Sequence, residues 1–381
     1  MIHRFAGAEA VVSSLRPADP LLLLHPGAAT AVARDTVAAF PGTVAYAVKV
    51  CDHPEVLRAL AAGGVREWDV ASIHEIEAVR AVAPDAELHY MNPVKSREHI
   101  AKAHGLGVKT FAFDCDAELL KISETTHGDR SILPVLRLAV PNDGARFPLD
   151  GKFGCAEDEA VRLVELLAAM GYRYGLTFHV GSQCEDVGAW AVATTMACRV
   201  AGRAGVMPDL IDIGGGFPAA YLGHEPVFAD CIAGAKRALD RDLPGFRGTF
   251  QCEPGRVLAA PAASVLVRVE LRKGDNLFLN DGYYGLLSEL KWMTALHPVR
   301  RIRPGHTGTT PSAAFRFFGP TCDSIDAMDG PYPLPADIDE GDWIEVSLMG
   351  AYSTVLSTRF NGFPESRVVV IDAPDHARMA A

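Results

Sequence analysis

The sequence predicts an α/β fold, a (β/α)8 TIM-like barrel with a second, mostly β C-terminal domain. Three observations predict it: short apolar runs alternate with helical stretches, polar or glycine residues end those runs, and the texture becomes β-rich after Arg256. Strands that alternate with helices are typical of parallel sheets, and eight of them close a barrel. We expect residues 26–260 to form the barrel, 261–381 the β domain, and 1–25 a segment that joins the β domain.

Eight apolar runs are the predicted barrel strands: Val44–Val48, Val65–Val70, Glu87–Met91, Lys109–Phe113, Leu133–Val140, Leu176–Val180, Asp209–Ile213 and Thr249–Cys252. Helical stretches separate them, for example Pro54–Ala62, Ile73–Val82, Ser96–His104, Ala117–Ser123 and Glu157–Met170. Because the carboxyl ends of barrel strands meet at one mouth, the residues at those ends are candidates for an active site. They are Lys49, Asp69, Asn92, Asp114, Arg137, His179, Gly214 and Glu253.

The segment after Arg256 has little helical periodicity. Its β-rich runs are Val265–Lys273, Asn276–Asn280, Phe315–Phe318, Trp343–Leu348 and Arg367–Ile371, separated by Gly, Pro and Asp turns. The stretch Arg300–Ala314 contains turn residues without periodicity, so we expect it to be irregular and mobile. Leu21–Leu24 precedes the barrel and is a candidate strand of the β domain.

Composition narrows the function classes. The 381 residues are 49% hydrophobic and 22% charged, which is ordinary for a soluble enzyme. A net charge of −11 without a basic cluster argues against nucleic acid or anionic membrane as partners, and no apolar stretch approaches the roughly 20 residues of a membrane span. The eight cysteines are scattered without a C-x-x-C pair, which predicts reduced thiols in the cytoplasm and no metal site.

Lys49 is the candidate with the most informative chemistry. It follows the apolar run Val44–Val48 and precedes the loop-like segment Cys51–Pro54. An amine at a strand end can form a Schiff base, and pyridoxal phosphate (PLP) is the usual cofactor that needs one. Most strand-end lysines are simply solvated, so the interpretation depends on the motifs further along the chain.

Three later motifs offer the groups that a phosphorylated pyridine needs. Gly214–Gly216 leaves backbone N–H groups unshielded and can wrap a phosphate, although a tight turn explains it equally well. Glu253 and Arg256 offer a carboxylate for a ring nitrogen and a cation for a phosphate, or else a structural ion pair. His179 and Ser182 offer a ring that stacks and a hydroxyl; the alternative for His179 is a buried core histidine.

Together, and in this order, these motifs resemble the PLP-dependent decarboxylases of fold type III, the alanine-racemase-like barrel group that includes ornithine and diaminopimelate decarboxylases. The resemblance covers nearly the whole chain and rests on Tyr46–Lys49, Asn92–Lys95, Phe113–Asp114, Lys152–Gly154, His179–Ser182, Asp212–Phe217, Glu253–Arg256, Gly319–Asp323, Gly350–Tyr352 and Phe360–Phe363. It implies a PLP enzyme that acts as a homodimer in the cytoplasm, with a place in polyamine biosynthesis.

The resemblance also implies residue roles. Lys49 forms the aldimine with PLP, His179 stacks on the ring, and Glu253 keeps the pyridine nitrogen protonated and so stabilises the quinonoid. Cys322, reaching into the partner subunit's active site, reprotonates the quinonoid carbon, and Lys152 pairs with Asp326 across the interface. The implied cofactor-binding residues are Lys49, Asp69, Arg137, His179, Ser182, Gly214, Gly215, Gly216, Glu253, Gly255, Arg256 and Tyr352.

The expected reaction is decarboxylation of a basic L-amino acid, ornithine or lysine first, to its amine. Cys322-Asp323 resembles the ornithine/lysine branch, because diaminopimelate decarboxylases carry Cys-Glu-Ser at this place. An ungapped match to that branch puts Met293 where a second acid is expected, and Glu289 is the candidate replacement. The expected substrate-binding residues are Cys322, Asp323, Tyr352, Phe360 and Glu289.

Several alternatives stay open. The substrate can be diaminopimelate or a conjugated or unusual amino acid. A racemase is disfavoured because racemases of this fold have an arginine where this chain has Glu253. A non-catalytic regulatory homologue is disfavoured because Lys49, Glu253, Arg256 and Cys322 are all present. The β-rich segment argues against a barrel-only PLP carrier, and a glycosidase-type barrel that uses Glu253 leaves Lys49 and the glycine triplet unexplained.

Overall fold

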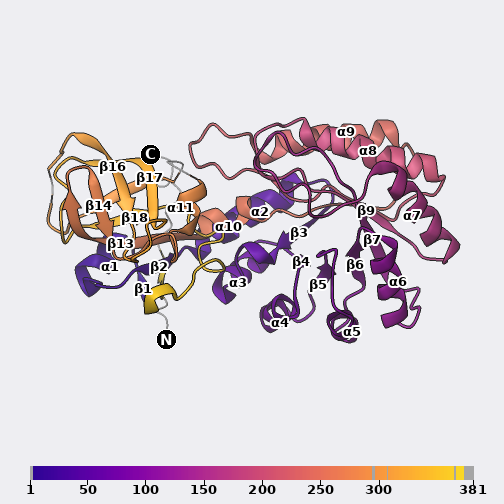
Figure 1. Ribbon diagram of the computed structural model, residues 1–381, viewed down its shortest axis with the longest axis horizontal. Helices are drawn as coiled ribbons and strands as arrows, with labels where there is room; N and C mark the ends of the chain where they lie inside the picture. Colours follow the sequence, from indigo (N-terminus) through magenta and orange to yellow (C-terminus); the bar gives the residue numbers. More distant parts are fainter. Residues whose placement is uncertain (1–2, 294–296, 307, 364–365, 373–381) are drawn as a thin grey trace. The chain divides into compact units, whose positions relative to one another are not determined.

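The computed structural model describes residues 3–293, 297–306, 308–363 and 366–372. The chain forms two compact units (Figure 1). The barrel unit contains residues 33–220 and 225–258, and the β unit contains residues 1–32, 221–224 and 259–381. Helices α2 (Pro26–Ala39) and α10 (Arg256–Ala259) each include a point where the chain passes from one unit to the other.

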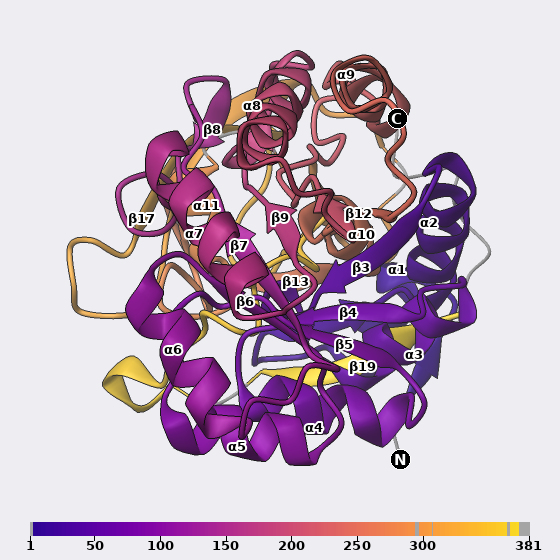
Figure 2. The same ribbon diagram turned by 90° about the vertical axis from the view of Figure 1, so that its right-hand side faces the viewer.

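Eight parallel strands close the barrel in the order β11-β12-β3-β4-β5-β6-β7-β9 (Figure 2). They are β3 Thr43–Ala47, β4 Glu67–Val70, β5 Glu87–Tyr90, β6 Thr110–Phe113, β7 Leu133–Arg137, β9 Gly175–Thr177, β11 Leu210–Asp212 and β12 Thr249–Cys252. Each predicted run overlaps one of them, so the predicted barrel is confirmed. The runs at Leu133–Val140 and Leu176–Val180 continue past their strands because the chain leaves the ladder at the mouth.

Helices follow the barrel strands, and α4, α5 and α6 lie outside β4, β5 and β6 (Figure 1). The set is α3 Pro54–Ala62, α4 Ile73–Val82, α5 Arg97–Gly105, α6 Asp116–Thr125, α7 Glu157–Ala169, α8 Ala189–Ala204 and α9 Phe228–Asp242. Local sequence fixes several starts. Ser72 and Ser96 accept backbone N–H groups as N-caps of α4 and α5, and Pro54 occupies the first turn of α3, where its missing N–H costs nothing.

The β unit is built on a nine-stranded sheet in which strands from the two ends of the chain meet. β1 (Arg4–Phe5) pairs with β19 (Arg367–Ile371), and β2 (Leu21–Leu24) lies between β19 and β13 (Ala263–Lys273). The other members are β14 Asn276–Leu279, β15 Val299–Ile302, β16 Ser312–Phe318, β17 Ala327–Pro335 and β18 Trp343–Val346. The β character predicted for this part of the chain is confirmed.

The prediction of an irregular stretch at Arg300–Ala314 is wrong at both of its ends. Residues 300–302 belong to β15, which pairs with β18, and residues 312–314 belong to β16. The strand β15 was hidden because its arginines carry no apolar alternation. Arg300 is instead bonded to Glu345 on β18, and Arg301 forms an ion pair with Asp337.

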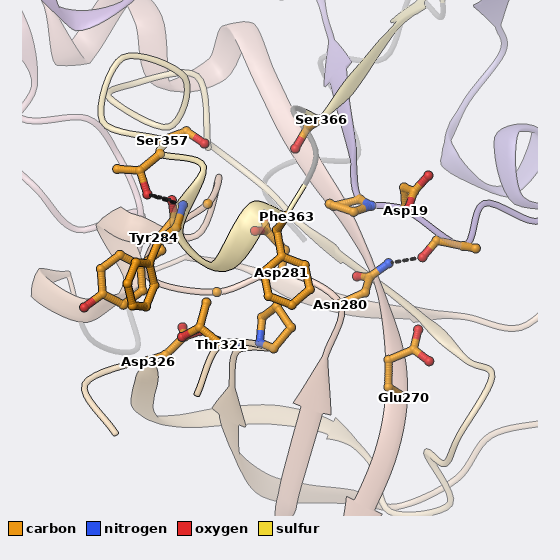
Figure 3. A pocket seen from close by; sticks show the side chains of 17 residues that line it. Asp19, Glu270, Asn280, Asp281, Tyr284, Thr321, Asp326, Ser357, Phe363 and Ser366 are labelled. Carbon is orange, nitrogen blue, oxygen red and sulfur yellow. Dashed lines mark hydrogen bonds between the residues drawn. The ribbon is translucent and has the colours of Figure 1, made fainter. Parts of the chain in front are cut away.

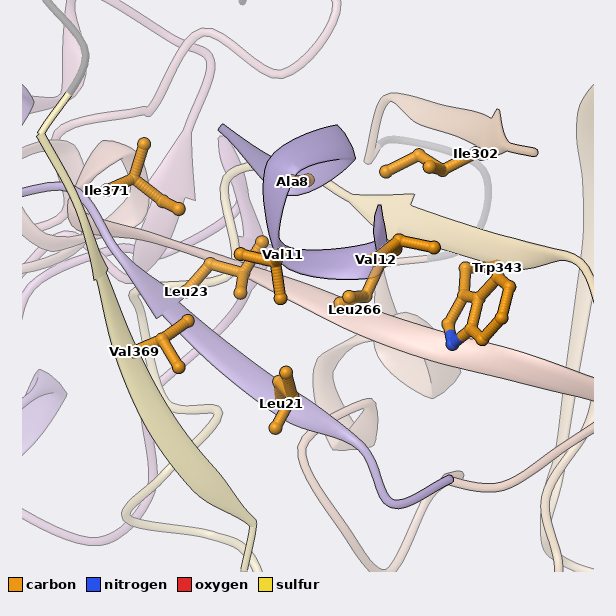
Figure 4. Packing of buried hydrophobic residues seen from close by; sticks show 10 residues of the cluster. All are labelled: Ala8, Val11, Val12, Leu21, Leu23, Leu266, Ile302, Trp343, Val369 and Ile371. Carbon is orange, nitrogen blue, oxygen red and sulfur yellow. The ribbon is translucent and has the colours of Figure 1, made fainter. Parts of the chain in front are cut away.

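An apolar cluster joins helix α1 (Ala8–Leu15) to this sheet (Figure 4). Val11 and Val12 on the helix pack with Leu21, Leu23 and residues of three other strands, and all are nearly or fully buried. Burying a side chain of this size contributes about 1.5–3 kcal/mol. The apolar face of the N-terminal helix is therefore part of the β unit's core.

Three further observations concern the described residues. No helix among them has the length and apolarity to cross a membrane. They contain no group of His, Cys, Asp and Glu side chains arranged to hold a metal ion. All eight cysteines fall within the described ranges and are free thiols, of which Cys322 is exposed.

Candidate active site

Lys49 lies at the mouth of the barrel, in the short helical turn η1 (Val48–Val50) that directly follows β3. Val48 and Val50 are buried, whereas the Lys49 side chain is 44% exposed, so two apolar neighbours anchor the turn and leave the amine accessible. The Tyr46 hydroxyl donates to the Cys51 carbonyl (3.0 Å) and closes the turn. The sequence therefore presents one amine at a fixed place.

Asp69 on β4 is the nearest carboxylate to this amine, with its Oδ2 3.9 Å from Lys49 Nζ. Burial raises the pKa of Asp69, and the positive charges of Lys49, His89 and Arg137 oppose that rise. Arg137, at the end of β7, is in turn surrounded by carboxylates, including Glu253. Opposite charges thus balance one another at the mouth.

Glu253 follows β12 and is hydrogen-bonded to Asp212 at the end of β11. Asp212 also accepts bonds from the Gly214 N–H (2.8 Å) and the Thr177 hydroxyl (3.2 Å). Burial and the neighbouring charges of Asp212 and Asp69 raise the pKa of Glu253 well above its usual range, so a proton is held between the two carboxyls. Glu253 Oε1 is buried and has no hydrogen-bond partner among the described residues, so it is available to a ligand.

The glycine triplet is required by close backbone packing. A Cβ at Gly214 would overlap the Phe178 carbonyl, and one at Gly216 (φ 95°) would overlap the Gly181 carbonyl. At Gly215 it would lie 2.6 Å from the Glu253 carbonyl oxygen. The tight-turn explanation therefore holds. It is compatible with phosphate binding, since the same absence of side chains leaves the N–H groups approachable.

The predicted phosphate ligands lie in two neighbouring segments. Arg256 Nε donates to the Ser182 hydroxyl (3.2 Å), which joins the start of α10 to β10 (Ser182–Cys184). A Cβ at Gly255 would lie 2.5 Å from Val50 Cγ2, so Gly255 packs against the turn that carries Lys49. Lysine, hydroxyl and guanidinium are thus brought to the same region of the barrel unit.

His179, which follows β9, is held on both sides. Its Nδ1 accepts the Gly181 N–H (3.0 Å), and its carbonyl accepts a bond from the Asn142 side chain (3.2 Å). Burial, assisted by the charges of Lys49 and Arg137, lowers the pKa of His179 well below its usual range. A neutral imidazole in fixed orientation is suited to stacking on an aromatic ring.

Two strand-end candidates serve loops. The Asn92 side chain donates to the Val94 carbonyl (3.0 Å), and Asp114 accepts the Gly154 N–H (2.9 Å). Neither bond reaches Lys49. Asp114 still contributes charge near Arg137, but its hydrogen bond is to the loop after β8 (Ala145–Phe147).

In the β unit, the predicted substrate residues gather on three loops. Exposed Cys322 donates from both its backbone N and its Sγ to Asn361 Oδ1 (3.2 and 3.3 Å). The Tyr284 hydroxyl donates to Asp323 Oδ2 (2.6 Å), and the Phe360 ring lies 4.5 Å from the Tyr284 ring. Hydrogen bonds from the Ile325 N–H and from Tyr284 lower the pKa of Asp323, so it is a carboxylate at neutral pH.

A cavity of about 260 Å³ lies behind these loops (Figure 3). Tyr284, Thr321, Asp326 and Phe363 are among the residues that line it. Asp326 is nearly buried and accepts bonds from the Tyr283 N–H (2.7 Å) and the Thr321 hydroxyl (2.6 Å). Its carboxylate therefore supports the loop that carries Cys322.

The remaining candidates also lie in the β unit. Tyr352 adopts a positive φ of 64° in the loop after β18. Glu289 is buried on α11 (Ser288–Trp292), and Met293, which follows that helix, has no exposed surface. Within this unit, therefore, neither Glu289 nor Met293 presents its side chain at the surface as Asp323 does.

Comparisons with known proteins identify the family. The model of the pyridoxal-dependent decarboxylase pyridoxal-binding domain matches residues 29–260, more than half of the chain. An ornithine decarboxylase of Panagrellus redivivus is 34% identical over 351 residues, covering 84% of this chain and 78% of that one. The chain belongs to the PLP-dependent ornithine/lysine/arginine decarboxylase family of fold type III.

Solved structures agree with this assignment. A lysine/ornithine decarboxylase from Vibrio vulnificus, complexed with cadaverine, superimposes with a TM-score of 0.81 and 29% identity over 97% of this chain and 100% of that one. An arginine decarboxylase of Paramecium bursaria Chlorella virus, bound to agmatine, has a TM-score of 0.85 and 26% identity over 95% and 98% of the two chains. The protein is a PLP-dependent amino-acid decarboxylase that acts on a small molecule.

Several residues at the decarboxylase's site were missed from the sequence. Glu75 on α4 is mostly buried near Asp69, and burial raises its pKa to about 7. It forms a capping box with Ser72, a signature that sequence inspection can find but that indicates only a helix start. His89 lies inside a strand with no neighbouring motif. Tyr284 stands inside Asn280–Gly285, whose glycines drew the attention instead.

Proposed function

We propose that this decarboxylase removes the carboxyl group of a basic L-amino acid, with L-ornithine and L-lysine as the first candidates. The observation that carries the proposal is the accessible Lys49 amine beside buried Asp69, in the same mouth as a buried Glu253 oxygen without a partner. Relatives named for ornithine, lysine and arginine decarboxylation support the substrate class.

The residues present fit PLP. The Lys49 amine is exposed enough to bind the cofactor covalently, and Glu253 Oε1, with the proton shared with Asp212, suits a pyridine nitrogen. Neutral His179 would stack on the ring. The proposed phosphate ligands are Ser182, Gly214, Gly215, Gly216, Gly255, Arg256 and Tyr352. Bound PLP supplies an electron sink for the pair left behind when carbon dioxide departs.

The chain's own groups then have separate tasks. Asp69 and Arg137 hold the charge balance around the Lys49 amine. Glu253 holds a proton at the place where a ring nitrogen would sit, which favours decarboxylation over reversible proton exchange. Cys322 donates the proton that replaces the carboxyl group, and its exposed thiol, oriented by Asn361, is accessible for that step.

Asp323 is the proposed ligand of the substrate's distal ammonium. Its carboxylate is ionised and oriented by Tyr284, and Phe360 adds an aromatic face. Met293 removes the second acid expected at its position, which costs on the order of a few kcal/mol of binding for a diamine tail. Glu289 is the proposed substitute, and a substrate with a weaker or conjugated distal cation is the alternative that Met293 favours.

We further propose that two copies complete each other's sites, with Cys322 and Asp323 entering the partner's barrel mouth and Lys152 paired with Asp326. Asp326 already accepts several bonds within its own chain, so Lys152 would approach an anchored carboxylate. The amine product places the enzyme in polyamine biosynthesis, in the cytoplasm, where its free thiols stay reduced.

The test is carbon dioxide release, with amine identification, from a panel of L-ornithine, L-lysine, L-arginine, diaminopimelate and neutral amino acids. We expect turnover of ornithine or lysine by the PLP-loaded protein and by the surface control Lys109→Ala, and none by Lys49→Ala. Turnover confined to neutral or conjugated amino acids would overturn the substrate assignment. Full activity of Lys49→Ala would overturn the role of Lys49.

A further inference from the structure

An ion pair lies among the barrel strands and has no part in the function proposed above. Glu67 begins β4 and His89 lies within β5, with His89 Nε2 2.8 Å from Glu67 Oε2. The His89 side chain is 5% exposed and that of Glu67 21%. In the β4–β5 ladder His89 is the register partner of Asp69, so the imidazole is next to the carboxylate that approaches Lys49.

The second nitrogen of His89 distinguishes it from an ordinary core histidine. Nδ1 is buried and has no hydrogen-bond partner among the described residues. Leaving a buried polar atom unpaired costs about 1–3 kcal/mol, so such an atom calls for an explanation. Holding a positive charge inside the barrel is one that the surroundings support.

The charged groups that face His89 come from several elements. β4 contributes Glu67 and Asp69, and Asp212 on β11 interacts with His89 electrostatically. On the other side, β6 contributes only uncharged Thr110, its register partner. The cations Lys49 and Arg137 approach the same carboxylates from the mouth. Carboxylates dominate around the imidazole, which favours its charged form.

We propose that Glu67 and His89 form a buried charge pair that keeps Asp69 ionised beside Lys49, which makes His89 a positioning residue for the lysine amine. The inference rests on the proposed role of Lys49 as the residue that binds the cofactor. Glu67 holds the proton on the imidazole, and the imidazolium offsets the burial of Asp69. Without that charge Asp69 takes up a proton more readily and loses its attraction for the amine 3.9 Å away.

The variants that test this are His89→Gln and Glu67→Gln, with Glu67→Asp as the conservative rescue. The matched control is His104→Gln. His104 Nε2 is 2.9 Å from Asp129, and Asp129 also binds Lys109, which precedes β6 at the opposite end of the barrel. The control therefore breaks a histidine–carboxylate pair of the same kind remote from the mouth. Circular dichroism establishes that each variant is folded.

The first readout is the pH dependence of kcat/KM and of the bound-cofactor absorbance in the PLP-loaded enzyme. Loss of a nearby positive charge raises the pH at which Asp69 ionises, so the acid limb moves to higher pH. We expect about one pH unit for His89→Gln, a smaller shift in the same direction for Glu67→Gln, and recovery in Glu67→Asp. His104→Gln leaves the limb in place.

The second readout needs no activity. In cofactor-free protein, acetic anhydride labels Lys49 at a rate set by its unprotonated fraction, which mass spectrometry of the digest quantifies. We expect several-fold faster labelling of Lys49 in His89→Gln near neutral pH, with the labelling of Lys109 unchanged. If His89→Gln does not fold, Glu67→Gln provides both readouts.

Two failures are distinguishable. An acid limb and a Lys49 labelling rate that are the same in His89→Gln, Glu67→Gln and His104→Gln would overturn this inference and leave the proposed function intact. Absence of a cofactor band in the unaltered protein would overturn the proposed function, while the labelling comparison would still decide whether His89 controls the Lys49 amine.

Discussion

The barrel mouth and the Cys322 loop of the β unit both contain candidate catalytic groups, but they hold them differently. At the mouth, Asp69 and Glu253 are buried, and burial is the largest cause of their raised pKa values. On the loop, Cys322 is exposed and Asp323 is held by hydrogen bonds that lower its pKa. Burial sets the chemistry of the first group, and access sets that of the second. Substitutions at the mouth are therefore expected to alter protonation and stability, and those on the loop the rate alone.

The largest expected effect is from Glu253→Gln at the mouth. The variant keeps the shape but cannot supply the carboxyl proton, and removing one preorganised electrostatic group typically costs about 10²–10³-fold in kcat. We expect that loss with the cofactor absorbance retained, measured by carbon dioxide release and spectroscopy. Exposed Glu270→Gln is the control and retains full rate. A Glu253→Gln enzyme within threefold of the unaltered rate would contradict the comparison.

Glu75 sharpens the role of burial. Its pKa is about 7 in the folded chain against an ordinary 4.5, so between these values the unfolded chain ionises while the folded chain stays protonated. The free energy of unfolding therefore falls as pH rises from about 4.5 to 7, by up to about 3 kcal/mol, and then levels off. Glu75→Gln removes this slope. Urea denaturation of both proteins between pH 5 and 8 measures it, and identical slopes would show that Glu75 is not buried as described.

Gly214→Ala tests the backbone packing of the mouth. The new Cβ would overlap the Phe178 carbonyl at a positive φ of 63°, so we expect destabilisation of about 2–3 kcal/mol. Gly107→Ala is the matched control, with φ 86° and open space around the added methyl, and should cost about 1 kcal/mol. Equal losses in the two variants would mean that the triplet is not tightly packed.

Cys322→Ala is expected to have the smallest effect of the four. It removes a proton donor from an exposed loop, so we expect a loss of about 10–100-fold in kcat and a change in the free energy of unfolding within about 0.5 kcal/mol. Cys322→Ser, which keeps a weaker donor, should fall between. A fall in stability comparable to that of Gly214→Ala would contradict the distinction between the two regions.

Much of the barrel was predictable because strand and helix periodicities alternate along it. Helices Pro54–Ala62 and Ile73–Val82 have the predicted bounds. In the β unit, β17 was missed because its sequence, AMDGPYPLP, has the glycine and prolines of a turn, yet it pairs with β16. Only the three-dimensional ladder shows that pairing.

The candidate site was predictable where chemistry coincides with a motif. Lys49, Glu253 and Arg256 end or follow predicted strands, and the structure brings them to one mouth. Glu67 and His89 have no such signal, because a polar residue inside a strand is recognised as a partner only when register places it beside another. Strand register is not readable from a single sequence at that precision.

The central claim is that Lys49 is the residue that binds the cofactor. The most direct test is borohydride reduction of the PLP-loaded protein, followed by digestion and mass spectrometry to locate the modified lysine. We predict one phosphopyridoxyl group, on the peptide that contains Lys49, and none in Lys49→Ala. Modification of Lys95, Lys152 or another lysine instead, or no modification at all, would contradict the account.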